Sequence, residues 1–335
     1  MPKTVSAAFS AFRSDYVDLD SHDVKEARAS RNYLVSQIAA IAERDTSFPA
    51  LLSGHLKFGS FARGTKIIEI DDIDLMIFMS GYGGTEITTF DPYRFKVFID
   101  NTTAPIYRLR GDDGYINSIR VLNKFKAELS QVHNYQKADL HRRMQAVTLK
   151  LTTYPWTFDI VPTFPVAATG MSDDIHYLIP NGTGQWIRTD PRRDKEHLDR
   201  LKAKHGDILL PLLRLLKCWN TNGAQPRLGS YYFETIALKA LDIYTAGSIS
   251  YLQIGLRAFF MNAGQYVVAT CPDPKGLGAD LDANVDWEKK MKVKAAIETA
   301  AYWSDQAVTA EIKDNHSKAI ACWQRVFGSE FPEYG

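Results

Sequence analysis

Hydrophobic positions change their spacing along this chain of 335 residues. In residues 21–45, apolar side chains recur every three or four positions, which predicts one long helix. Ser21, at its start, can cap that helix. Short apolar runs with glycines at their joints then predict strands. These strands are expected over residues 56–58, 66–70, 73–78 and 94–99.

The middle of the chain alternates between the two patterns. Helical spacing predicts helices over residues 115–132 and 135–146. Two apolar runs, at residues 147–152 and 156–161, predict two more strands. The second strand is expected to end at Pro162, because proline cannot donate a ladder hydrogen bond.

Beyond about residue 195 the strand signal nearly disappears. Helices are predicted over residues 195–205, 207–221, 230–246, 248–269, 287–311 and 316–327. The pattern therefore predicts an α+β protein. We expect a mixed sheet within residues 1–195, an all-helical domain in residues 196–335, and an active site in the cleft between the two domains.

Composition narrows the class of protein. The chain holds 40 Lys+Arg against 39 Asp+Glu, so it lacks the basic excess typical of proteins that bind long nucleic acid. Its three cysteines are too few and too far apart for a disulfide framework or a zinc site. No apolar stretch approaches the roughly 20 residues that span a bilayer. We expect a cytoplasmic protein that binds a small anionic ligand and no membrane.

The densest chemistry lies in residues 58–66 (FGSFARGTK). Gly59 and Gly64 let the backbone approach a bulky group, so that backbone N–H groups can face an anion. Further donors in the segment are Ser60, Arg63, Thr65 and Lys66. The glycine spacing imitates a P-loop, but the order Thr65-Lys66 is the reverse of what that motif requires. We interpret the segment as a phosphate cradle of another kind.

Two acids follow the cradle. Asp72 and Asp74 lie two positions apart on a predicted strand, so they share one face while Ile73 and Leu75 point into the core. Two carboxylates beside a phosphate cradle suit a pair of Mg²⁺ ions, whose open positions bind substrate phosphates. An Asp-x-Asp pair taken alone is more often a solvated sheet face, but the Gly-Ser turn upstream favours the metal site.

A third acid, Asp159, interrupts the apolar run of residues 156–161. A carboxylate in a buried strand needs a partner, and either a bound cation or a salt bridge to an arginine would supply one. Asp159 comes 85 residues after Asp74 (159 − 74), so a meeting of the two depends on the fold.

Several of these segments resemble a known family. Gly59-Ser60, Asp72-Ile73-Asp74 and residues 158–162 (FDIVP) resemble the nucleotidyltransferase superfamily of DNA polymerase β. The resemblance is strongest to the branch of cyclic GMP-AMP synthase, oligoadenylate synthases and the bacterial, DncV-like CD-NTases. Residues 213–220 (LRLLKCWN) and 229–234 (GSYYFE) resemble the segments with which this branch holds the donor nucleotide. A polymerase-β-like fold is therefore expected.

The resemblance implies a role for each candidate. Asp72 and Asp74 would hold two Mg²⁺ ions, which Mn²⁺ can replace, and Asp159 would complete the metal site beside the acceptor hydroxyl. Donor contacts are expected from Gly59, Ser60, Arg63, Thr65, Lys217, Ser230 and Tyr231. Tyr231 would stack on a base. On the residues alone, Lys217 fits a solvated helix flank equally, and Tyr231 or Tyr232 fits a core aromatic.

The same resemblance implies an activity. We expect a cyclic di- or oligonucleotide second messenger to be made from ATP and/or GTP in bacterial antiphage (CBASS) signalling, with 3′–5′ and 2′–5′ linkages both open. The alternatives are an RNA-tailing or tRNA-directed nucleotidyltransferase and an inactive nucleotide-binding scaffold. Some bacterial relatives end in a small residue that a ubiquitin-transfer-like partner couples to an amine, so Gly335 is an expected conjugation point.

Overall fold

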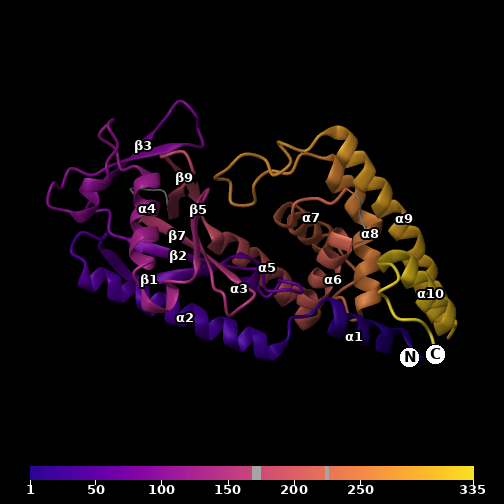
Figure 1. Cartoon of the computed structure of the whole chain (residues 1–335). Helices are drawn as coiled ribbons and strands as arrows, with labels where there is room; N and C mark the ends of the chain where they lie inside the picture. Colours follow the sequence, from indigo (N-terminus) through magenta and orange to yellow (C-terminus); the bar gives the residue numbers. More distant parts are fainter. Residues whose placement is uncertain (168–174, 223–225) are drawn as a thin grey trace. The chain divides into compact units, whose positions relative to one another are not determined.

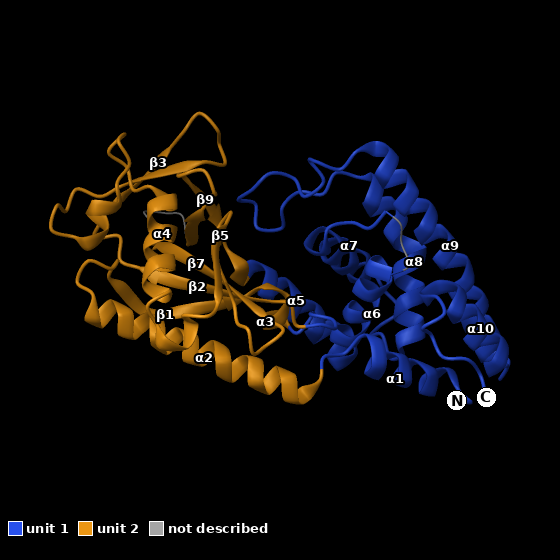
Figure 2. Cartoon of the chain, viewed as in Figure 1, with its two compact units in different colours: residues 1–19, 64–69, 193–335 blue, residues 20–63, 70–192 orange. Residues whose placement is uncertain are grey.

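A computed structural model describes residues 1–167, 175–222 and 226–335, which form two compact units (Figures 1 and 2). The helical unit comprises residues 1–19, 64–69 and 193–335, and the sheet unit comprises residues 20–63 and 70–192. The division expected after residue 195 lies close to the last crossing between the units. Residues 1–19 and 64–69, however, pack with the later helices.

The sheet unit is built on one mixed sheet (Figure 1). Its strands are β1 (Leu51–Phe58), β2 (Asp72–Met79), β3 (Thr85–Thr88), β4 (Phe95–Phe98), β5 (Asp139–Arg143), β6 (Ala146–Lys150), β7 (Thr157–Val166), β8 (His176–Pro180) and β9 (Trp186–Thr189). The main path runs β1-β2-β7-β8-β9-β4-β3, and the β5–β6 hairpin joins it where β6 pairs with β7. Strands β2 and β7 are parallel, whereas β1 and β6, which flank them, are antiparallel.

Helices α2 (Ser21–Arg44) and α4 (Ser118–Leu129) complete the core of the sheet unit. Helix α4 packs on β6, β7 and β8, and α2 packs on α4. Val121 and Phe125 of α4 are fully buried, and so are Ile73 and Leu75 of β2 to within 1%. The apolar alternation predicted for β2 is therefore present. The shorter elements of this unit are α3 (Gly59–Arg63) and two 3₁₀ turns, η1 (Pro105–Leu109) and η2 (His133–Tyr135).

The helical unit has one continuous apolar core. Its helices are α1 (Val5–Tyr16), α5 (Pro191–His205), α6 (Leu209–Asn222), α7 (Ser230–Asp242), α8 (Leu252–Val268), α9 (Trp287–Ile312) and α10 (His316–Phe327), with the 3₁₀ turn η3 (Gly206–Ile208) before α6. Helix α1, which the sequence pattern did not predict, packs against α10. The ring of Phe9 lies 5.1 Å from that of Trp323 and 5.0 Å from that of Phe331. The two ends of the chain thus share one aromatic cluster.

Three expectations about secondary structure are wrong. Residues 135–146 form no α-helix: Tyr135 is the last residue of η2, and residues 139–146 belong to the β5–β6 hairpin, because Leu140 pairs with Leu149 and Met144 turns the chain with a left-handed φ of 49°. Residues 66–70 form no strand, because the backbone N–H of Ile68 donates to Val17 O within the helical unit instead of to a sheet neighbour.

The third error concerns Pro162, which does not end β7. On the edge of β7 away from β2, the pairing with β6 stops at Ile160 and the pairing with β8 starts at Phe164. Pro162 lies in the gap between these partners, where no ladder hydrogen bond is needed on that edge. Strands β3, β8 and β9 were not predicted. No helix among the described residues is long and apolar enough to cross a membrane.

Candidate active site

Strand register brings the two acid-containing segments of the sequence, residues 72–74 and 158–162, together on the sheet. In the parallel pair of β2 and β7, Asp74 lies directly opposite Asp159, and Asp72 lies opposite Thr157. Side chains two apart on a strand, and side chains directly opposite on neighbouring strands, share one face. Asp72, Asp74 and Asp159 therefore lie on the same face, away from the buried Ile73.

The Gly-Ser turn is placed against these acids by the neighbouring strand. Phe58, the last residue of β1, pairs with Asp74, so Gly59 follows at the level of that carboxylate. A Cβ on Gly59 would lie 1.7 Å from Asp74 Oδ2, and the φ of Gly59 is +72°. Only glycine fits both the close approach and the left-handed backbone. Ser60 follows, half-buried, in the short helix α3.

Asp159 is the acid whose surroundings the structure defines best. Its Oδ1 accepts a hydrogen bond of 2.9 Å from the hydroxyl of Thr148, which lies opposite it on β6. Burial raises the pKa of Asp159, and repulsion from Asp72 raises it further, whereas the hydrogen bond from Thr148 and the charge of Arg143 act in the opposite direction. The position therefore disfavours a second negative charge nearby.

A pocket of about 260 Å³ opens beside the acids. Its lining residues are Phe58, Asp74, Arg143, Met144, Gln145, Ala146, Asp159, Val161 and Ile179. The tip of the β5–β6 hairpin thus forms one wall and the acid-bearing strands form another. Carboxylate oxygens are the ligands that Mg²⁺ and Mn²⁺ prefer, and a cation would relieve the repulsion between Asp72 and Asp159. This donor set fits a divalent-cation site.

The helical unit holds a second group of candidates. Glu234 Oε2 accepts a hydrogen bond from Thr65 Oγ1 at 2.9 Å and forms an ion pair with Lys217 Nζ at 3.1 Å. Thr65 is fully buried, and Lys217 and Glu234 are 6% and 3% exposed. Lys217 is therefore a buried side chain of α6, not a solvated flank. Sequence reasoning missed Glu234, although it is the one acid in the apolar run of α7.

Tyr231 also lies in an internal network of the helical unit. Its hydroxyl donates to Asp194 Oδ1 at 2.6 Å and accepts from Lys275 Nζ at 2.6 Å. The Lys275 ammonium lies 4.3 Å from the centroid of the Tyr231 ring, a cation–π distance. Tyr232, beside it, is 4% exposed and is the core aromatic of the two. Ser230 is exposed at the first position of α7.

The structure thus places the predicted residues in two groups. Gly59, Ser60, Arg63 and the three aspartates belong to the sheet unit, whereas Thr65, Lys217, Ser230 and Tyr231 belong to the helical unit. Sequence reasoning missed Arg143, because residues 135–146 were predicted as a helix, and it assigned no role to Thr148, although the strand that carries Thr148 was predicted. The alternation of polar and apolar residues in residues 146–150 could have identified Thr148 as a neighbour of a buried strand.

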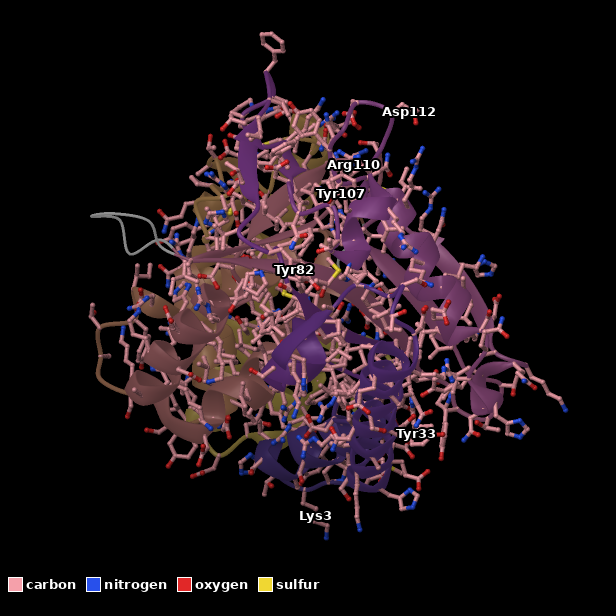
Figure 3. All side chains as sticks on the ribbon, turned by 90° about the vertical axis from the view of Figure 1, so that its left-hand side faces the viewer. Lys3, Tyr33, Tyr82, Tyr107, Arg110 and Asp112 are labelled. Atoms are coloured by element: carbon pink, nitrogen blue, oxygen red, sulfur yellow. The ribbon has the colours of Figure 1, made fainter. Side chains whose placement is uncertain are left out.

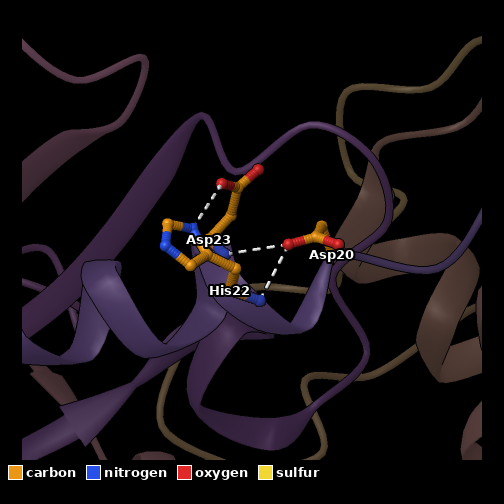
Figure 4. Close-up of side chains that lie close together, drawn as sticks. All are labelled: Asp20, His22 and Asp23. Carbon is orange, nitrogen blue, oxygen red and sulfur yellow. Dashed lines mark hydrogen bonds and ion pairs between the residues drawn. The ribbon is translucent and has the colours of Figure 1, made fainter.

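A separate cluster of possible metal ligands has a structural explanation. Asp20, His22 and Asp23 offer ligand atoms within 4.8 Å of one another, and all three residues are exposed (Figure 4). Asp20 Oδ1 accepts from the backbone N–H groups of His22 and Asp23, at 2.7 and 3.2 Å. Asp20 is therefore the N-cap of α2, and the cluster follows from that cap.

A second, polar hollow of about 270 Å³ lies at the start of α4. Its lysine, Lys96, is paired with Asp113 at 2.9 Å and rests over the ring of Tyr115. Nearby, the guanidinium carbon of Arg110 lies 3.4 Å from the ring centroid of Tyr107 (Figure 3). These local pairings account for the charges around the hollow, which contributes nothing to the acid site.

The arrangement of acids and Gly-Ser turn on β1, β2 and β7 is that of a nucleotidyltransferase, and comparison with known proteins agrees. The chain is 37% identical over 340 residues to a probable cyclic nucleotide synthase of Bacillus cereus (strain VD146), with 100% of this chain and 99% of that protein covered. No family model matches the chain. The chain belongs to the CD-NTase family, so the resemblance seen in the sequence is confirmed.

Solved structures show the same fold. CdnC of E. coli MS115-1, in a complex with HORMA-deltaN, has a TM-score of 0.67 at 18% identity, over 97% of this chain and 98% of that one. DncV of Vibrio cholerae, in complex with a linear intermediate, has a TM-score of 0.56 at 13% identity, over 84% of this chain and 70% of that one. The predicted α+β class, a mixed sheet with a C-terminal helical region, is confirmed.

Proposed function

We propose that this nucleotidyltransferase makes a cyclic di- or oligonucleotide second messenger from ATP and/or GTP, with two Mg²⁺ ions that Mn²⁺ can replace. The observation that carries the proposal is the position of Asp74. Its carboxylate lies against Gly59 on one side, where only glycine fits, and opposite Asp159 on the other. The turn that we propose to bind phosphate and the acids that we propose to bind cations therefore lie side by side on the sheet.

The residues have distinct roles in the proposed reaction. Asp72, Asp74 and Asp159 would hold the two cations, which when bound stabilise the attacking hydroxyl and the leaving pyrophosphate. The Gly59-Ser60 turn binds donor phosphate through backbone N–H groups and the Ser60 hydroxyl. Asp159, held in place by Thr148, lies farther from that turn and orients the acceptor hydroxyl for in-line attack on the α-phosphate.

The remaining predicted donor contacts extend the proposal. Arg63, Thr65, Lys217 and Ser230 would contact the donor phosphates, and Tyr231 would stack on the donor base. The buried pair of Lys217 with Glu234 supports a fixed position for the ammonium group. Among solved CD-NTases, CdnC has been determined with ATP, and DncV with ATP and GTP. ATP and GTP are accordingly the first substrates to test.

A product assay tests the proposed function. The purified protein would be incubated with each labelled triphosphate, singly and in pairs, with Mg²⁺ or Mn²⁺, and then treated with phosphatase. A cyclic product has no terminal phosphate and keeps its label. Cleavage by a nuclease specific for 3′–5′ linkages distinguishes these from 2′–5′ linkages. Label found only on added RNA would support the RNA-tailing alternative, and no pyrophosphate release under any condition would support the inactive scaffold.

The cellular part of the proposal is antiphage signalling in the cytoplasm, with a ubiquitin-transfer-like partner that conjugates Gly335 to a target amine. Phe331 is fully buried and anchors the tail, while Tyr334 and Gly335 are exposed beyond it. The backbone N–H of Gly335 donates to Pro2 O at 3.2 Å. Intact-mass analysis after co-expression with such a partner tests this role. An equal adduct on a chain without Gly335 would exclude it.

A further inference from the structure

Arg143, at the end of β5, is a basic side chain that neither the sequence motifs nor the proposed mechanism uses. Among the described residues that line the acid pocket, it is the one basic side chain, beside the carboxylates of Asp74 and Asp159. It is exposed, and within the described part of the chain it has no hydrogen-bond or ion-pair partner within 4 Å. Its positive charge nevertheless acts to lower the pKa of Asp159.

The hairpin that carries Arg143 is held at both ends. At its base, Thr148 of β6 donates a hydrogen bond to Asp159. At its tip, a Cβ on Gly182, in the turn between β8 and β9, would lie 3.2 Å from the Cα of Met144. Gly182 has a φ of +86°, so this close packing is available to glycine and strained for other residues. Arg143 is therefore presented to the pocket by a fixed wall.

The order of the strands places the donor turn and Arg143 on opposite sides of the acids. At the acid site, the strand order across the sheet is β1, β2, β7, β6 and β5. The proposed donor-phosphate turn follows β1, Asp74 lies on β2, and Asp159 lies on β7. Arg143 lies beyond Asp159, on the flank opposite the donor turn. For a nucleotide whose hydroxyl is held at Asp159, the β5–β6 hairpin is therefore the pocket wall on the side away from the donor turn.

We infer that Arg143 binds the 5′-phosphates of the acceptor nucleotide. This inference rests on the proposed function and deepens it. An acceptor triphosphate carries a polyanionic chain into a pocket that already holds carboxylates, and the proposed cations act at the acceptor hydroxyl and the donor phosphates, not at the acceptor's own 5′-phosphates. An arginine can bind phosphate oxygens with two parallel N–H···O bonds. Arg143 supplies this contact on the acceptor flank, and it selects acceptors that carry 5′-phosphate over those that do not.

The test separates donor from acceptor by chemistry. A 2′,3′-dideoxynucleoside triphosphate lacks an acceptor hydroxyl, so it can only donate. Its transfer onto ATP, AMP or adenosine as acceptor would be measured for the wild type and for Arg143→Gln. Arg142→Gln is the matched control, because Arg142 is the adjacent residue of the same hairpin and pairs with Val147 on the opposite face. Arg143→Lys keeps the charge but loses the paired donors.

The wild type is expected to prefer ATP over adenosine as acceptor. Arg143→Gln should raise the KM for acceptor ATP at least about tenfold, the loss of one charge-assisted hydrogen bond, and should leave the KM of the dideoxy donor unchanged. The KM of Arg143→Lys for acceptor ATP should lie between those of the wild type and Arg143→Gln, and the KM of Arg142→Gln should match that of the wild type. An equal rise in donor KM, or no difference between Arg143→Gln and Arg142→Gln, overturns the inference. If the wild type transfers to no acceptor, the proposed function itself fails.

Discussion

The two compact units treat their buried charges in opposite ways. In the sheet unit, Asp159 is half-buried within reach of a like charge on Asp72, and both effects raise its pKa. In the helical unit, Lys217 is buried against Glu234, and the same carboxylate accepts from Thr65. The first arrangement brings two carboxylates close together, and the second brings together an ammonium group and a carboxylate.

This difference predicts that a bound cation stabilises the acids of the sheet unit, whereas the Lys217–Glu234 pair stabilises the helical unit without a ligand. Gathered carboxylates repel one another, and a cation that binds them recovers that energy only in the liganded protein. A paired ammonium and carboxylate stabilise the fold without a ligand, provided that both partners stay. Removing one charge should therefore have different consequences in the two units, and the following predictions use that contrast.

The largest expected effect is the loss of activity when one acidic charge is removed from the sheet unit. Asp74→Asn keeps the shape of the side chain and removes its charge, so turnover should fall on the order of 10³-fold or more because cation binding supplies several kcal/mol to the reaction. The midpoint of thermal unfolding without metal should change little, because the shape of the side chain is kept. Product formation and calorimetry measure the two. Near-normal turnover would contradict the metal-site assignment.

Removing one acidic charge from the helical unit is expected to lower the stability of the fold. Glu234→Ala leaves the buried ammonium of Lys217 without its carboxylate, which should cost about 3 kcal/mol of unfolding free energy. The double variant Lys217→Met, Glu234→Leu removes both charges and should cost clearly less. Urea unfolding of both variants checks this. If the double variant is as unstable as the single one, packing and not charge explains the loss.

Gly59 tests how closely the turn must approach the acid. In Gly59→Ala, the new Cβ meets Asp74 Oδ2 and the backbone must keep a φ of +72°. Asp74 must then move, so turnover should fall on the order of 10²-fold, since small displacements at a reacting centre are this costly. Gly54→Ala is the matched control, because Gly54 has a φ of +94° and open space around its Cβ position. Equal losses of activity in both variants would point to backbone strain alone.

Much of this architecture could be predicted from the sequence, and most of the misses share one physical cause. The helices of residues 196–335 and strand β2 show strong periodicity within one window, so each was predicted. Strand β5 was missed although its partner β6 follows directly. Helix α1 and strands β8 and β9, in contrast, depend on partners elsewhere: α1 packs on residues beyond 316, and β8 continues the sheet from β7. Local periodicity contains no information about such partners.

The candidate site shows the same limit. Asp72 and Asp74 stand out in the sequence because both lie on one strand beside the Gly-Ser turn. That Asp159 lies opposite Asp74 follows only from the parallel register of β2 and β7. Arg143 belongs to no motif, and Glu234 was given no role although it ends the segment 229–234. Only the packing of α6 on α7 and the hairpin wall of the pocket show what these two residues contact.

Tyr231, in the helical unit, allows an effect on stability to be distinguished from an effect on nucleotide binding. Tyr231→Phe keeps the ring that would stack on a base but loses the bonds of the hydroxyl to Asp194 and Lys275, each 2.6 Å long. It should lower the unfolding free energy by about 1–2 kcal/mol and leave the donor KM nearly unchanged. Tyr231→Ala should raise the donor KM as well. A changed KM in Tyr231→Phe would assign the hydroxyl, not the ring, to the nucleotide.

The smallest effect concerns a partly exposed pair in the sheet unit. Asp45 Oδ2 accepts from Lys124 Nζ at 2.6 Å, and this bond is the main reason that the pKa of Asp45 lies well below its usual range. A depressed pKa stabilises the fold above the unfolded value of about 3.9, and the stabilisation is lost as pH falls through the lower folded value. Asp45→Asn should cost no more than about 1 kcal/mol at pH 7. The difference from wild type should shrink below about pH 4, as measured by urea unfolding at several pH values.

The shared aromatic cluster of α1 and α10 has a consequence for synthesis in the cell. Phe9 packs against Phe331, 322 residues later (331 − 9), and α1 is amphipathic with Phe9 and Phe12 buried by that end of the chain. At about 10 residues per second, α1 leaves the ribosome roughly half a minute before its partner exists. The sheet unit, from residue 20 to residue 192, can form in that interval. The helical unit cannot close its core until α10 and Phe331 have emerged, so its first segment remains without these partners, with apolar side chains exposed, during that interval.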